Sequence, residues 1–186
     1  SLGSNGVPVT TGAIGFSVQS GELGIAIVQA NTLTSVGDNR SYLATSASIG
    51  QAEFVGLPTD ISIRAADISV DINRASGVVP QSAPARAPPA LNWTQAIDID
   101  GDGVFADTVT AGTRTIALTS DFTGISGKLG LNAFHVLQVF ASFEMTIRTV
   151  DVDVNGDGLI NPGSGARTDL DDAQLLAIDL QFLQLN

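Results

Sequence analysis

Two short aspartate-rich segments carry the residue types that bind a hard metal ion. They are DIDGDGVFAD at 98–107 and DVNGDGLIN at 153–161. Each places side-chain oxygens at its first, third and fifth positions and a glycine at the sixth, where a calcium loop turns sharply around its ion. The spacing predicts one calcium site in each segment, because Mg²⁺ keeps more waters and needs fewer protein ligands. The alternatives are an Asp-Gly hairpin turn for the first segment and an acidic turn for the second.

Each loop has a defined set of expected ligands. In the first loop they are the side chains of Asp98, Asp100, Asp102 and Asp107, with the backbone carbonyl of Val104. In the second loop they are the side chains of Asp153, Asn155, Asp157 and Asn161, with the carbonyl of Leu159. The twelfth position of the first loop is Val109, which has no side-chain oxygen. We therefore expect Asp107 to close that loop in a tighter form.

The closing ligand of the second loop must come from beyond an insertion. Its twelfth position is Ser164, which cannot supply the bidentate carboxylate usual there. After the insertion, Thr168 is a suitable N-cap for a short helical turn that begins at Asp169. On such a turn Asp169 and Asp172 share a face and Asp171 points elsewhere. We favour Asp172 as the closing ligand, with Asp169 as the other candidate.

The amino-acid composition supports cation binding by these loops. The chain has 186 residues and a net charge of -11, and ten of its 16 aspartates lie between 98 and 107 or between 151 and 172. The acidity is therefore local, which suggests a cation, and the scarcity of Lys and Arg argues against nucleic-acid binding. There is no cysteine, and no apolar run approaches the length of a membrane span.

The elements that must position the loops are strands. Apolar residues alternate with polar ones from Ile61 to Asn73, with a change of phase that predicts a β-bulge near Ala65 and Ala66. A longer alternating run extends from Leu129 to Ile147, as one strand or as several broken at bulges. We expect an all-β, elongated, mostly antiparallel sheet or sandwich-like module with long bulged strands and one short helical turn. A β-solenoid-like repeat is the alternative.

The chain is expected to form a single module over residues 1–186. Residues 76–92 are rich in Pro and Ala and predict a surface excursion. Residues 175–186 resemble the opening of the chain and are candidates for the first strand of a following repeat. Trp93 is interpreted as a packing anchor for the excursion, rather than a carbohydrate platform. His135, in the apolar register of the long run, is interpreted as a core or interface residue rather than a catalytic base.

Four segments together resemble a module repeated in very large exported bacterial proteins of the adhesin-like, calcium-dependent surface kind. They are GELGIAIV, RSYLATSASIGQAEFVGLP, ISIRAADISVDINRA and GKLGLNAFHVLQVFASFEMTIR. The second metal loop is also similar, over about nine residues, to the calcium loops of dockerins and EF-hands. A strand precedes it rather than a helix, so a complete EF-hand is not expected. The resemblance implies an extended β unit strung in tandem with neighbouring repeats, in a secreted or cell-surface protein, and no enzyme activity. The absence of cysteine fits export from a Gram-negative-type bacterium.

The sequence thus predicts a non-enzymatic, calcium-binding structural or spacer module. Two other classes stay open. The first is a calcium-dependent recognition module, in which the excursion and the loops present a surface for a glycan or protein ligand. The second is a hydrolase with an aspartate-held metal, which needs an open coordination position beside an acid/base pair.

Overall fold

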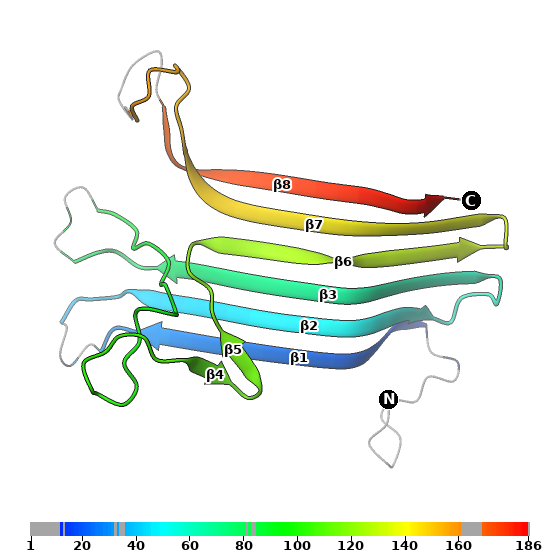
Figure 1. Ribbon diagram of the computed structural model, residues 1–186, viewed down its shortest axis with the longest axis horizontal. Helices are drawn as coiled ribbons and strands as arrows, with labels where there is room; N and C mark the ends of the chain where they lie inside the picture. Colours follow the sequence, from blue (N-terminus) through cyan, green and yellow to red (C-terminus); the bar gives the residue numbers. More distant parts are fainter. Residues whose placement is uncertain are drawn as a thin grey trace.

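The computed structural model describes residues 12, 14–31, 33, 36–80, 82, 85–160 and 169–185 (Figure 1). Within these residues all regular structure is β, as expected, and no helix that could span a membrane is present. Six strands form one sheet in the order β1-β2-β3-β6-β7-β8, and every neighbouring pair is antiparallel. A parallel stack of coils, which a β-solenoid would require, is not what these residues form.

The strands of the main sheet are long, as the alternating runs predict. Five have 15 or 16 residues and β6 has 12, against a usual five or six. Their bounds are β1 Gly15–Gln29, β2 Ser41–Val55, β3 Ile61–Ser76, β6 Phe122–Ala133, β7 Leu137–Val152 and β8 Leu170–Leu185. Residues 175–185 lie within β8, which pairs with β7 at one edge of this sheet.

A row of backbone irregularities crosses the first three strands. Ser20 and Asp67 have φ values of 59° and 52°, and Gly50 lies between them on β2. The register of β3 against β6 shifts between Ala66 and Ser69, which confirms a bulge close to the expected place. Each strand changes the phase of its apolar alternation here, so its apolar side chains stay on one face of the sheet.

The run from Leu129 to Ile147 is a hairpin rather than one strand. It turns at Phe134 and His135, whose φ values are 53° and 55°, and the amide of Val136 donates to the carbonyl of Ala133. His135 is exposed in this turn, so its assignment to the core is wrong. The strands pair with Ala133 opposite Leu137, so odd-numbered residues stay on one face through the turn and the alternation does not reveal it.

The excursion after β3 is longer than expected and folds back over one face of the sheet. It continues through residue 121 and contains a small hairpin, β4 Val109–Ala111 and β5 Arg114–Ile116, which contacts β1 and β2. Figure 1 shows it crossing β3, β2 and β1 near one end of the sheet. Its buried contacts with the sheet centre on Ala44, Trp93 and Ile116.

Trp93 anchors this insertion, as its position beside the excursion predicts. Its side chain is 1% exposed, and its indole N–H donates to Asn73 Oδ1 at 2.9 Å. The Asn73 amide in turn donates to the carbonyls of Leu91 and Ser120, at 2.9 and 2.8 Å. Asn73 follows the polar phase of β3 but is completely buried, because the insertion covers it.

Candidate metal loops

The two aspartate-rich loops fold in the same way. The first carboxylate of each accepts two backbone N–H groups, three and five residues further on. Asp98 accepts from Gly101 and Gly103 at 2.7 and 3.0 Å, and Asp153 accepts from Gly156 and Gly158 at 2.6 and 2.7 Å. All four glycines have positive φ, which an L side chain rarely adopts. The repeated motif therefore encodes one repeated loop conformation.

The third and fifth positions also match between the loops. Asp100 and Asn155 each accept the backbone N–H of the residue two further on, at 3.1 and 2.8 Å. Asp102 and Asp157 accept in the same way from Val104 and Leu159, at 2.7 and 2.9 Å. These bonds fix the side chains but leave lone pairs on each carboxylate that can bind a cation.

The closing carboxylates are equivalent as well. Asp107 Oδ2 accepts the N–H of Ile99 at 2.5 Å, and Asp169 Oδ1 accepts the N–H of Val154 at 3.0 Å. Ile99 and Val154 are the second residues of their loops, so Asp107 and Asp169 occupy the same place. Asp107 is thus positioned as the sequence predicts. The expected helical turn is not formed, because the segment enters β8 directly, and Asp169 rather than the favoured Asp172 lies with Asp153 and Asp157.

Among the described residues, three groups of carboxylates could hold a metal ion, each with one oxygen per residue within 4.8 Å of the others. The groups are Asp98, Asp100 and Asp107; Asp153, Asp157 and Asp169; and Asp151, Asp171 and Asp172. Asp102 is outside these groups, although it lies in the first loop. Asn161, Ser164 and Thr168 lie outside the described residues.

The third group was missed by sequence reasoning. Its three residues are exposed, and the N–H of Asp172 donates to Asp151 Oδ1 at 3.1 Å. Asp172 has a φ of 55°, and the β7–β8 register shifts between Val150 and Val152. The extra residue lies on β8, where Asp171 and Asp172 face the single Asp151 of β7. The signal in the sequence was a change of apolar alternation on β7, from Ile147 to Val150 and Val152, which indicates an irregularity nearby.

The first and second loops are separate in space. The loop at 98–107 lies beside the β4–β5 hairpin near the β1 edge, whereas the loop that begins at Asp153 projects beyond β7 and β8 (Figure 1). They lie towards the same end of the sheet but at its opposite edges. A single cluster formed by both loops is therefore not what the fold builds.

Hydrogen bonding makes Asp153 a stronger acid than usual. The N–H of Gly158, with further donors in the same loop, holds the pKa of Asp153 below its ordinary value of 3.8. Asp169 is 3% exposed beside it, at the start of β8. The second loop therefore presents ionised oxygens to a cation at neutral pH.

This shift gives a pH prediction for the metal-free protein. A lowered folded-state pKa stabilises the fold above the unfolded value, and this contribution disappears as the pH falls through the folded pKa. We expect the thermal midpoint to fall as the pH is lowered from 5 to below 3.8, and Asp153→Asn to reduce this dependence. Melting curves by circular dichroism in EDTA would measure it, and an equal dependence in both proteins would contradict the assignment.

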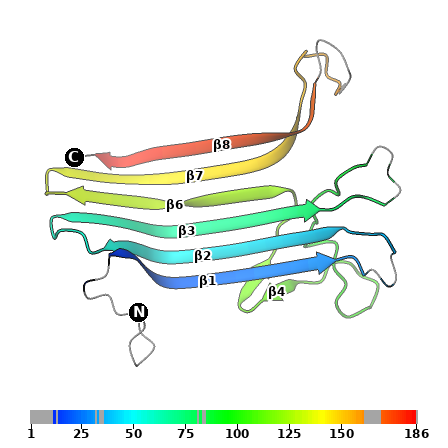
Figure 2. The same cartoon turned by 180° about the vertical axis from the view of Figure 1, so that it is seen from behind.

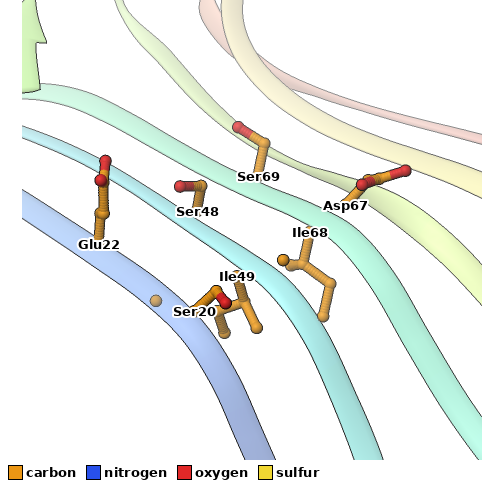
Figure 3. Close-up of a pocket in the computed structure, with 9 residues that line it drawn as sticks. Ser20, Glu22, Ser48, Ile49, Asp67, Ile68 and Ser69 are labelled. Atoms are coloured by element: carbon orange, nitrogen blue, oxygen red, sulfur yellow. The ribbon is translucent and has the colours of Figure 1, made fainter.

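A hollow lies at the bulge row. It is lined from β1, β2 and β3, and Figure 3 shows Glu22, Ser48 and Ser69 on one side of the strands, with Ile49 and Ile68 on the other. Glu22 is paired with Arg114 at 3.5 Å. The neighbouring Asp67 is paired with Lys128 at 2.7 Å. Both carboxylates of the hollow are thus neutralised by basic side chains.

Comparison of the chain with protein-family models, with curated proteins and with solved structures gives no match.

Proposed function

We propose that this chain is a non-enzymatic, calcium-stabilised structural module of a large extracellular bacterial surface protein of the adhesin-like kind. The observation that carries the proposal is the equivalence of Asp107 and Asp169. Two loops of different length, one with an insertion, bring a carboxylate to the same place against the same backbone N–H. Convergence on one arrangement of like charges is expected where a cation occupies the loop.

The donor set favours calcium over other cations. All candidate ligands are hard oxygens from carboxylates, two amides and the backbone, which suit Ca²⁺ and Mg²⁺ rather than metals that prefer nitrogen or sulfur. A wrapped loop can offer several of them at once, and Ca²⁺ takes six to eight oxygens in flexible geometry. The loops are largely exposed, so we expect the weak binding of extracellular calcium modules, with Kd about 10⁻⁴–10⁻³ M.

The position of the loops favours a structural role. The second loop lies in the connection between β7 and β8, and the first belongs to the insertion that covers Asn73. A bound cation would neutralise the carboxylates and hold each connection in one conformation. In the hollow of Figure 3 the carboxylates are ion-paired, so the described residues there offer no free acid/base pair for hydrolysis.

Removal of calcium is expected to lower stability. A ligand that binds only the folded state stabilises it by RT ln(1 + [L]/Kd), about 2.7 kcal/mol at a hundredfold excess over Kd. Chelation should therefore lower the thermal midpoint by several degrees, and Ca²⁺ should restore it where equal Mg²⁺ does not. Differential scanning calorimetry in EDTA, CaCl₂ and MgCl₂ would measure the shift. An unchanged midpoint after chelation would remove calcium from the proposal.

A further inference from the structure

One face of the main sheet is largely apolar, and no part of the chain that the structure describes covers it. Figure 2 shows the sheet from behind, where no described segment crosses the strands, whereas the insertion lies on the opposite face. Strand register and alternation assign large apolar side chains to this bare face. Before the bulge row they are Leu23, Ile25, Ile27, Leu43, Ile49, Ile68, Val70, Ile72, Ile125, Phe143, Met145, Ile147, Leu176, Ile178 and Leu180, and Phe182 follows beyond it.

The bulge row keeps the face apolar beyond that point. Because β1, β2 and β3 change phase there, Phe16, Phe54 and Ile63 follow on the same side. The rings of Phe16 and Phe54 lie 5.1 Å apart, edge to face. Without the bulges, these strands would turn their polar residues to this face, so the irregularities preserve a single continuous apolar surface.

This surface is exposed within one copy of the chain. Ile25 is 49% exposed on β1, and Ile178 and Phe182 are 68% and 66% exposed on β8. Monomeric soluble proteins rarely expose a contiguous apolar patch above a few hundred Å². A cover of comparable size and apolar character is therefore required.

The distribution of charged residues is compatible with a second copy of the chain as the cover. Between the two ends of the strands the bare face carries no Asp or Glu, although the chain has a net charge of -11; Asp121 and Asp151 follow its alternation only at the end nearest the metal loops. Acidic positions of the strands, such as Glu22, Glu144 and Asp179, alternate to the opposite face. The basic residue of the bare face, Arg74, is paired with Asp121 at 3.3 Å near one end of the sheet. Away from that end, two such faces can approach without bringing carboxylates together.

The area is sufficient for a stable pair. Six strands about 4.8 Å apart and roughly 40 Å long give a face of about 1,000 Å². Two stacked faces would bury about 2,000 Å² in total, above the roughly 1,600 Å² of a standard stable interface. Sheets stack in this way about 10 Å apart, with their strands aligned to within about 30°.

We infer that two copies of this chain pack through their bare sheet faces and form a two-layer β-sandwich with twofold symmetry. The contact is isologous, because the same apolar face serves both copies, and it closes at two copies. This inference is independent of calcium, since the metal loops lie outside the face.

Sedimentation equilibrium of the whole chain, in calcium and in EDTA, tests the inference. The wild type should be a dimer in both conditions. Ile178→Lys places a charge on the bare face and should raise the dissociation constant at least tenfold. Gln181→Lys is the matched control, because it adds the same charge to the same strand on the opposite face, and it should leave the dimer intact.

Other outcomes would overturn the inference. One is a monomer at all concentrations, which would mean that another segment of the chain covers the face. Another is open-ended assembly, which would indicate pairing of the β1 and β8 edges. Equal effects of the two lysine variants would also overturn it. If Ile178→Lys loses its β-sheet circular dichroism, Ile178→Thr takes its place, because a β-branched polar residue suits a strand.

Discussion

Replacing Trp93 with alanine is expected to lower the free energy of unfolding by about 3–5 kcal/mol, the usual cost of deleting a buried tryptophan side chain. Trp93 is the largest of the fully buried side chains, and it joins the insertion to the sheet beside Ala44 and Ile116. Its loss also leaves Asn73 Oδ1 without the indole donor in a buried place. Both effects act on the same contact between insertion and sheet.

The measurement is urea unfolding followed by far-ultraviolet circular dichroism, since Trp93 is the single tryptophan and fluorescence is lost with it. Phe105→Ala is the matched control, because Phe105 is an aromatic residue of the same insertion that is 59% exposed. It should cost well under 1 kcal/mol. A Trp93→Ala protein as stable as the control would mean that the insertion does not anchor on the sheet.

A variant that keeps the ring separates packing from hydrogen bonding. Trp93→Phe retains most of the apolar contact but removes the N–H that Asn73 accepts. We expect an intermediate loss of about 1–3 kcal/mol, the cost of an unsatisfied buried acceptor. Equal losses for Trp93→Phe and Trp93→Ala would assign the whole effect to the hydrogen bond.

The β class and the long strands could be predicted because alternation reports directly which face of a strand is buried. The signal fails where two strands stay in phase across a turn, as from Ala133 to Leu137, and where the turn residues are not the usual Asn-Gly. The alternation also misleads at Asn73, whose polar side chain suggests a solvent-exposed face. Its burial depends on an insertion that returns from far along the chain, which local alternation does not encode.

The metal loops were predictable because their chemistry is local. In each loop the first-position aspartate accepts the N–H groups of two glycines, and these contacts fix the same turn in both loops. What could not be predicted was which acid returns to close the second loop. An N-cap threonine followed by acids favours a helical turn, but the long β-pairing of β8 with β7 outweighs that local preference. The extended segment separates Asp169 from Asp171 and Asp172.

That separation gives the sharpest test of the metal sites. Asp169→Asn is expected to weaken calcium binding at the second loop by about 10–100-fold, because it removes the charge of the closing ligand and keeps the shape of the side chain. Asp171→Asn is the matched control, because it removes the same charge two residues after Asp169, from the group that contains Asp151. It should leave this site nearly unchanged.

Isothermal titration calorimetry with CaCl₂ on the two variants and the wild type would measure the effect. The first loop supplies an internal reference, because its group of Asp98, Asp100 and Asp107 shares no residue with the second. One binding event should therefore survive in Asp169→Asn with its affinity unaltered. If Asp171→Asn were the damaging change instead, the cation would sit between β7 and β8 at the bulge, and the equivalence of Asp107 and Asp169 would have no role in binding.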